Sequence, residues 1–241
     1  MTREHLGDYA ALGIAVCKRL AVPCCLVFNE SPHLDWVRKA IQLGFGLVMF
    51  TDEQLPYPEL VAQVTRIAQE AHAAHVAVEA ELMALPGVAG SLDDLPQDLP
   101  LTNAKHAREF VEQTLVDALA VNVGQAHLHG RQPVHLNLER LAELRASIRV
   151  PLVLHGATSV AREDLAQAIR VGARKINVGS ALKQSYLNAL RDACAELGAE
   201  YNPYEVMGSG LEADVLTIAR SALQKTVEEW MGVFGSIGRA S

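Results

Sequence analysis

The stretch PLVLHGATSV, from Pro151 to Val160, decides the fold class of this chain. It is an apolar run that ends in His155-Gly156, with the hydroxyl residue Thr158 two positions later. A second short apolar run further along ends in a similar polar turn, KINVGS, which closes on Ser180. Enzymes of the α/β class place their chemistry at the carboxyl ends of parallel strands. Two consecutive runs of this kind therefore indicate an α/β enzyme.

Short apolar runs alternate with amphipathic helical patterns along the whole chain. The runs are continuously apolar, as expected of strands that are buried on both faces of a parallel sheet. The predicted strands are residues 23–29, 47–51, 76–82, 118–124, 151–155 and 175–179. The predicted helices are residues 5–20, 34–43, 57–74, 103–114, 136–147, 162–171 and 181–197, with two further helical stretches within 211–234.

This alternation predicts a TIM (β/α)8-type barrel with six strands visible in the chain. No Ser/Pro-rich linker divides it, so we expect a single domain over residues 1–241. A closed barrel of this class has eight strands, and the helical pattern at the start indicates that the first two are absent, which makes the barrel N-terminally short. Residues 83–100 form a long acidic loop, which is typical of a functional lid or mobile segment.

Composition and charge exclude several classes of function. Half of the residues are hydrophobic and 20% are charged, which favours a sizeable core over disorder. The net charge of -7 and the absence of a Lys/Arg cluster argue against a nucleic-acid partner. No apolar run approaches the ~20 residues that span a bilayer, and no signal peptide is visible. Four cysteines without CxxC spacing indicate reduced, mostly buried thiols in a cytoplasmic protein.

Polar side chains follow every predicted strand, and some of them are suited to bind a metal. His127 follows the fourth strand and His155 the fifth. A single histidine at such a place is more often a hydrogen-bonded structural residue, but two on neighbouring strand ends favour a zinc-type site together with one glutamate. Glu79 and Glu81 alternate with period two, so both point to the same side of their strand. They form either an acid/base pair or a satisfied polar cluster.

The turns after the last two predicted strands have the composition of a phosphate site. Small residues, hydroxyls and an amide lie directly before helical patterns, whose N-termini add partial positive charge. These residues are Gly156, Thr158, Asn177, Gly179 and Ser180. Ordinary helix N-capping by Thr158, Ser159 and Ser180 explains either turn equally well when it is taken alone.

Several segments together resemble the class II, metal-dependent ketose-bisphosphate aldolases of the fructose- and tagatose-bisphosphate types. The segments are VPCCLVFNES, HAAHVAVEAEL, VDALAVNVGQAH, PLVLHGATS, KINVGSALK and FGSIGRA. The resemblance implies a (β/α)8 barrel whose first two strands this chain lacks, and a divalent metal, usually zinc, that polarises the carbonyl of a phosphorylated ketose. With this resemblance we expect a homo-oligomer, either a dimer or a tetramer.

The resemblance carries the last two metal histidines of the family onto His127 and His155, and the first onto Glu30. At the position just before Glu30, the family has an aspartate that exchanges a proton during C–C bond making and breaking. This chain has Asn29 there, and an amide cannot transfer that proton. Glu81 or an acid of the lid would then take over proton transfer. The phosphate positions, named above, fit the family with conservative changes.

Other departures from the family accumulate outside the phosphate turns. The family's DGSH reads TDEQ at residues 51–54, Leu128 replaces the glycine after the second metal histidine, and the lid loop at residues 89–94 has Leu92 in place of an acid. We therefore carry three hypotheses: a metal-dependent aldolase-family lyase with altered catalytic details, a catalytically impaired paralogue that binds a sugar phosphate, and a truncated barrel whose motifs are remnants.

Overall fold

The computed structural model describes residues 5–87, 100–127 and 133–240. The lid positions 89–94, Leu128 and His129 lie outside these ranges. Within the described ranges, no helix is long and apolar enough to cross a membrane.

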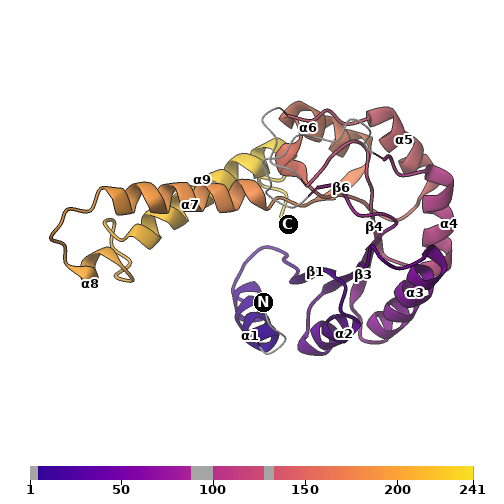
Figure 1. Ribbon diagram of the computed structural model, residues 1–241, viewed down its shortest axis with the longest axis horizontal. Coiled ribbons are helices and arrows are strands. Elements are labelled where there is room, and N and C mark those ends of the chain that lie inside the picture. Colours follow the sequence, from indigo (N-terminus) through magenta and orange to yellow (C-terminus); the bar gives the residue numbers. More distant parts are fainter. Residues whose placement is uncertain (1–4, 88–99, 128–132, 241) are drawn as a thin grey trace.

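Six parallel strands form one sheet in the order in which they occur along the chain, from β1 to β6. They are β1 (Val27–Ser31), β2 (Leu47–Phe50), β3 (Ala77–Glu81), β4 (Ala118–Ala120), β5 (Leu152–Leu154) and β6 (Ala173–Ile176). The sheet curves into a half-barrel whose helices lie around its outside (Figure 1). The predicted fold, a parallel α/β barrel type with six sequential strands, is confirmed.

The helices largely follow the predicted ranges, and two of them match at both ends. They are α1 (His5–Cys17), α2 (Leu34–Leu43), α3 (Tyr57–Ala73), α4 (Ala104–Thr114), α5 (Leu138–Ser147), α6 (Arg162–Val171), α7 (Ser180–Ala195), α8 (Pro203–Val206) and α9 (Val215–Phe234). The terminal region that the sequence predicted as two helical stretches contains the single long helix α9. The short helix α8 was not predicted.

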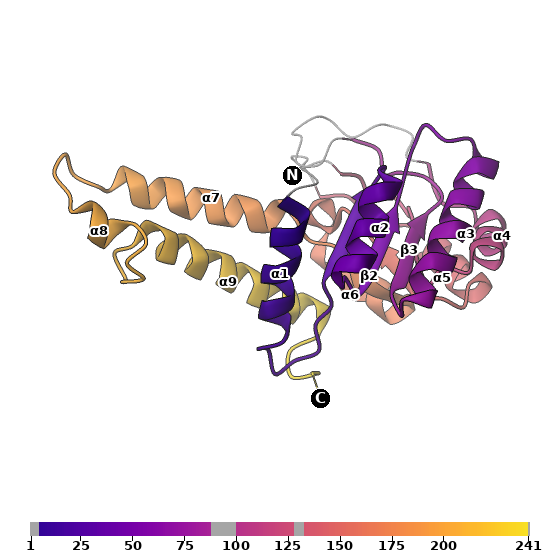
Figure 2. The ribbon, with the colours of Figure 1, turned by 90° about the horizontal axis from the view of Figure 1, so that it is seen from below.

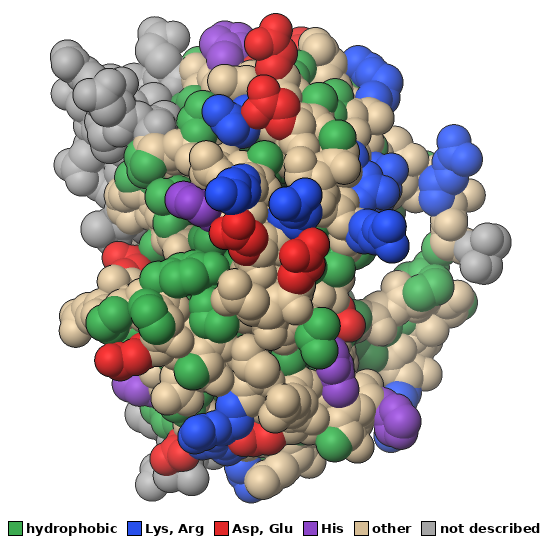
Figure 3. Space-filling model, turned by 90° about the vertical axis from the view of Figure 1, so that its right-hand side faces the viewer, with side chains coloured by type: hydrophobic (Ala, Val, Ile, Leu, Met, Phe, Trp, Pro, Cys, Tyr) green, Lys and Arg blue, Asp and Glu red, His purple; other side chains and the backbone are tan. Residues whose placement is uncertain are grey.

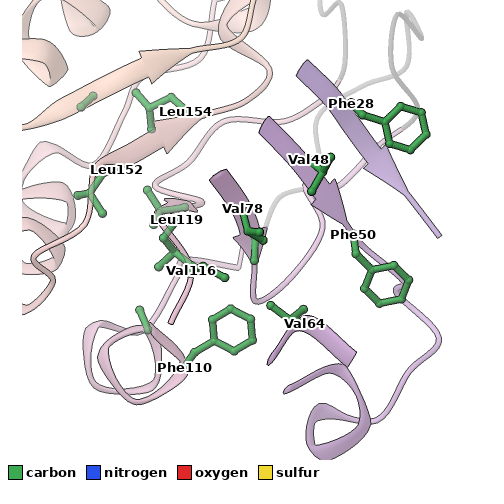
Figure 4. Close-up of a cluster of buried hydrophobic side chains, with 14 of the residues drawn as sticks. Phe28, Val48, Phe50, Val64, Val78, Phe110, Val116, Leu119, Leu152 and Leu154 are labelled. Carbon is green, nitrogen blue, oxygen red and sulfur yellow. The ribbon is translucent and has the colours of Figure 1, made fainter. Parts of the chain in front are cut away.

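The hydrophobic core lies between the outer face of the sheet and the helices. Val48 of β2, Val78 of β3 and Leu119 of β4 belong to this core together with Phe110 of α4 (Figure 4). The inner face carries a separate apolar cluster of Ala118, Ala120 and Val153. These residues pair in register with the neighbouring strands, where Ala118 and Ala120 lie opposite Glu79 and Glu81.

The beginning of the first strand differs from the prediction. β1 starts at Val27, because the preceding Pro23-Cys24-Cys25 segment is not paired with β2. Cys24 and Cys25 are consequently exposed, as is Cys194. The expectation that the thiols are mostly buried was therefore wrong.

Helices α7 and α9 form an antiparallel hairpin that projects from the barrel, with α8 near its tip (Figures 1 and 2). A hydrogen bond from Thr226 Oγ1 to Ser185 Oγ, 2.8 Å long, joins the two helices. Large apolar side chains are exposed at the tip, including Tyr204 at 87% and Met207 at 60%. The outer face of the barrel differs from this apolar tip, because it carries acidic and basic side chains that lie side by side (Figure 3).

Candidate metal and phosphate site

Three side chains from distant parts of the sequence meet at the carboxyl end of the sheet. Glu30 belongs to β1, His155 follows β5, and His127 lies in the loop after β4. One potential ligand atom from each residue lies within 4.8 Å of the other two. The structure thus brings together the three residues that the resemblance assigned to the metal.

A β-bulge directs Glu30 into this cluster. The pairing of β1 with β2 shifts register between Phe28 and Ser31, and Glu30 within the bulge has a φ of 49°. A bulge re-aims a side chain, and a non-glycine residue in the left-handed region is uncommon and strained. Strain of this kind concentrates at functional sites, so the local backbone supports a functional role for Glu30.

Two carboxylates hold the imidazole of His155. Glu30 Oε1 lies 2.6 Å from its Nδ1, and Glu79 Oε1 lies 2.8 Å from its Nε2. Burial opposes the charged imidazolium, but the two hydrogen bonds outweigh it and raise the pKa of His155 to about 9. The same hydrogen bond with His155 is the main cause that lowers the pKa of Glu30.

Lys175 on β6 extends this chain of charges. Its Nζ lies 2.9 Å from Glu79 Oε2, and Glu79 itself is fully buried. Burial of Glu79 favours its neutral form, but hydrogen bonding to His155 and the charge of Lys175 together lower its pKa. Glu79 is therefore a buried carboxylate that is held between two cationic groups.

Backbone contacts position His127 opposite Glu30. The His127 N–H donates to the carbonyl of Pro86 at 3.0 Å, and His127 Nε2 lies 3.7 Å from Glu30 Oε1. The preceding loop is pinned by buried Gln125, whose amide donates to the carbonyl of Val121 at 2.6 Å. Burial lowers the pKa of His127, which favours the neutral imidazole that a metal requires.

The donor set fits a divalent metal. Two imidazoles and one carboxylate, with room for a further ligand, suit zinc and similar cations. Metal-bound histidines usually donate their second nitrogen to a carboxylate, which fixes the ring and the tautomer. Glu79 holds Nε2 of His155 in this manner and leaves Nδ1 facing Glu30 and His127.

Glu81 lies on the same face of β3 as Glu79, while Val78 and Ala80 belong to the hydrophobic core on the other face. Its Oε1 accepts a hydrogen bond from Thr51 Oγ1 at 2.6 Å. Burial is the largest influence on Glu81 and raises its pKa to about 7, although the bond from Thr51 opposes the shift. Glu79 and Glu81 thus lie on the same side of their strand, as the period-two pattern predicts.

The turns after β5 and β6 contact each other. Thr158 Oγ1 accepts a hydrogen bond from the N–H of Ala181 at 3.3 Å, and Asn177 N–H donates to the carbonyl of Leu154 at 2.8 Å. Gly156 has a φ of 66°, and a Cβ there would lie 2.6 Å from the carbonyl oxygen of Ala126. Only glycine fits this close approach of two backbones.

A cavity of about 550 Å³ joins the turns after β5 and β6 to the cluster of Glu30, His127 and His155. Its walls include all of the residues that the sequence predicted for phosphate binding, together with Asn29. The predicted site residues that line it are Asn29, Glu30, His127, His155, Gly156, Thr158, Asn177, Gly179 and Ser180. Glu81 instead lines a second cavity of about 420 Å³, which shares Glu30 and His127 with the first.

Two lysines that were not predicted from the sequence, Lys175 and Lys183, also line the larger cavity. Lys183 lies in the first turn of α7, beside the phosphate turn. A signal for Lys175 was present, because a lysine within a short buried strand needs an anionic partner. Its partner, Glu79, lies on a strand that is distant in sequence, so the pair could not be read from spacing alone.

Comparisons with known proteins place the chain in a family. Residues 3–239 match the family described as fructose-bisphosphate aldolase class-II. The fold is similar to the YdjI aldolase from Escherichia coli K12, with a TM-score of 0.78, 23% identity, and coverage of 98% of this chain and 78% of that one. It is also similar to a putative fructose-1,6-biphosphate aldolase from Coccidioides immitis, with a TM-score of 0.78, 24% identity, and coverage of 97% and 79%.

A third similar structure is the fructose-bisphosphate aldolase from Campylobacter jejuni, with a TM-score of 0.74, 17% identity, and coverage of 95% of this chain and 75% of that one. The chain belongs to the class II fructose-bisphosphate aldolase family. Family membership and fold together support an aldolase-type lyase as the class of this protein.

Proposed function

We propose that this protein is a divalent-metal-dependent lyase that cleaves or forms a C–C bond in a phosphorylated ketose, with chemistry of the dihydroxyacetone phosphate type. The observation that carries the proposal is one cavity that contains both the Glu30–His127–His155 cluster and the two small-residue turns. A phosphorylated ketose whose phosphate is bound at these turns would place its carbonyl group at the Glu30–His127–His155 cluster.

Glu30, His127 and His155 would hold the metal, for which zinc is the best match to the donors. A bound divalent metal supplies a Lewis acid that polarises a carbonyl oxygen. With a metal bound, Glu79 would hold the proton on His155 Nε2, and Nδ1 would give up its own proton and serve as the ligand atom. The ion pair with Lys175 keeps Glu79 charged and in place.

The phosphate would bind at the turns after β5 and β6. Helix α7 begins at Ser180, which lines the cavity, so the positive end of the helix dipole lies at this wall. Gly179 has no heavy atom within 4 Å of where a Cβ would stand, which leaves open space for an anion to approach the backbone. Lys183 adds a positive charge to the same wall.

Proton transfer falls to Glu81 in this proposal. A carboxyl with a pKa of about 7 can both accept and release a proton near neutral pH. Asn29 lines the cavity next to Glu30, where its amide can orient a substrate hydroxyl by hydrogen bonding but cannot exchange its proton. Asn29 therefore acts as a positioning residue here.

Exchange of the hydroxymethyl protons of dihydroxyacetone phosphate in D2O, followed by NMR, tests the proposal. The zinc-loaded protein should catalyse exchange, and His155→Gln should not. His135→Gln is a matched control, because His135 pairs with Asp164 on the outer surface. Absence of exchange in the zinc-loaded protein, with no cleavage of any ketose phosphate, would contradict the proposal.

Asn29, which stands where the family has an aspartate, supports a second candidate function, that of a catalytically impaired paralogue. If no other group replaces the acid at this position, the protein binds a sugar phosphate without standard aldol cleavage. Isothermal titration, which measures binding, distinguishes the two candidates when it is combined with the proton-exchange assay. Binding of dihydroxyacetone phosphate without proton exchange would favour the impaired paralogue, whereas binding with exchange would favour the lyase.

We further propose that the chain forms a homo-oligomer, a dimer or tetramer, through the α7–α9 hairpin. Exposed apolar side chains at its tip include Tyr201, Tyr204, Met207 and Leu211. Clusters of this kind on a projecting element usually mark protein–protein contacts. Light scattering should give a multiple of the 26.1 kDa chain mass, and Tyr204→Glu with Met207→Glu should shift the mass toward the monomer.

A further inference from the structure

We propose that the ketose cleaved by this protein carries no phosphate at its far end, so that the aldehyde product is an uncharged hydroxyaldehyde. This inference rests on the proposed function. It concerns the half of the substrate that becomes the aldehyde, which lies on the opposite side of the metal cluster from the phosphate turns. Cleavage of the C3–C4 bond leaves its electron pair on C3, which takes up a proton, while the C4 hydroxyl loses its proton as the aldehyde forms. The reaction needs no other reactant.

The two cavities of the site differ in charge. The larger one, on the phosphate side, has Lys175 and Lys183 in its walls. The smaller one, of about 420 Å³, is lined by Asp52, Glu53 and Glu81, and among the described residues no lysine or arginine lines it. Among the described residues only the larger cavity is lined by lysines, so the smaller one, with its three carboxyl groups, is the less favourable place for a phosphate dianion.

The arrangement fixes which half of a substrate enters each cavity. Glu30 and His127 line both cavities and therefore mark the boundary between them. With a phosphate at the α7 N-terminus and the carbonyl at the cluster, carbons beyond the carbonyl extend into the smaller cavity. A second phosphate would lie beside the acidic side chains there.

The acidic side chains of the smaller cavity lie close together. Asp52 and Glu53 follow β2, Glu81 ends β3, and all three line this one cavity. At its boundary Glu30 adds a further carboxylate, so together they repel an anion. A phosphate dianion would meet the same repulsion, which is weakly screened in a partly enclosed site.

The same carboxylates suit hydroxyl groups. Asp52 Oδ1 accepts a hydrogen bond from the N–H of Gln54 at 3.0 Å, which fixes its carboxylate within the turn after β2. Its remaining lone pairs, and those of the exposed Glu53, can accept hydrogen bonds from a polyhydroxylated chain. The cavity thus favours sugar hydroxyls and disfavours a second phosphate.

Binding of two non-cleavable analogues, hexitol 1-phosphate and hexitol 1,6-bisphosphate, to the zinc-loaded protein tests this inference by calorimetry. We expect the monophosphate to bind at least ~10-fold more tightly, because repulsion of two or three carboxylates opposes the second phosphate. Kinetics should agree: kcat/KM for condensation of dihydroxyacetone phosphate should be higher with glyceraldehyde than with glyceraldehyde 3-phosphate.

The double variant Asp52→Asn/Glu53→Gln should remove most of the preference. Glu59→Gln/Glu139→Gln is the matched control, because it deletes two exposed carboxylates that line neither cavity and should leave the ratio unchanged. Equal or tighter binding of the bisphosphate would overturn the inference. If dihydroxyacetone phosphate and both hexitol phosphates all fail to bind, the proposed function itself is wrong.

Discussion

The two ends of the site are built in different ways. The end proposed to bind phosphate, after β5 and β6, is made of small residues, a left-handed glycine and a helix N-terminus. The other end, after β1 and β2, is made of individual side chains, of which Glu30 is held in a strained bulge. A backbone site tolerates conservative side-chain changes, whereas a side-chain site changes its chemistry with each substitution. This explains why the resemblance to the family is closest at the phosphate turns and weakest at Asn29 and Glu30.

The largest effect should come from a change at the backbone end. Gly156→Ala would place a Cβ 2.6 Å from the Ala126 carbonyl oxygen at a φ of 66°. We expect a loss of roughly 3 kcal/mol in the free energy of unfolding, from strain and overpacking together, measured by urea denaturation. Gly179→Ala is the control, because no atom lies near its Cβ position and its φ is -130°. Equal stabilities of the two variants would show that the turn is not held by this close contact.

Substitutions at the other end of the site, at Asn29 and Glu30, should change the rate of catalysis rather than the stability of the fold. If Asn29 and Glu30 are simple losses from an aldolase, Asn29→Asp with Glu30→His should raise fructose- or tagatose-bisphosphate cleavage by at least ~100-fold, the usual contribution of a positioned acid/base. Steady-state assays with saturating zinc measure this gain. No gain, combined with loss of the native activity, would show that both residues are specialised for another substrate.

A substitution of Glu79 tests whether the carboxylate that is bonded to His155 contributes to metal binding. Glu79→Gln removes the charge that holds His155 Nε2 and leaves Lys175 without its buried partner. We expect the affinity for zinc to fall by roughly 10- to 100-fold, as is usual when the carboxylate behind a metal-bound histidine is lost. Competition with a chromogenic chelator gives the affinity. An unchanged value would mean that Glu79 only fills the core.

Glu81 should give the smallest stability effect and the clearest pH dependence. Its folded-state pKa of about 7 is raised above the ordinary value of 4.5, so its contribution to stability is present at low pH and is lost as the pH rises from 4.5 through 7. Glu81→Gln should therefore gain at least ~1 kcal/mol relative to the unmodified chain between pH 5 and pH 7.5.

The same group should shape the pH profile of cleavage. The carboxylate form accepts the proton, so kcat/KM should rise through an inflection near pH 7 that disappears in Glu81→Gln. If the inflection persists in the variant, another group carries the proton.

Much of the fold followed from the sequence, because buried parallel strands and amphipathic helices have distinct patterns. Helices α2 and α6 match their predicted bounds at both ends. The start of β1 was missed because Pro23-Cys24-Cys25-Leu26 is as apolar as a strand, although pairing with β2 begins only at Val27.

The site was harder to predict than the fold. His127, His155 and the phosphate turns could be placed because strand ends converge at one edge of a parallel sheet. The inward direction of Glu30 could not be read from the residues alone, since it depends on a bulge with a positive φ at a residue that is not glycine. The link from His155 through Glu79 to Lys175 was also not predicted, because Glu79 lies on β3, which is distant in sequence from β5 and β6.

Titration of the metal-free protein with zinc tests the central claim most directly, because the claim is that Glu30, His127 and His155 form one metal centre. Isothermal calorimetry should show one zinc ion per chain, with the affinity strongly reduced in His155→Gln and in Glu30→Gln and unchanged in the surface variant His135→Gln. Absence of zinc binding, or equal binding by all four proteins, would contradict the account.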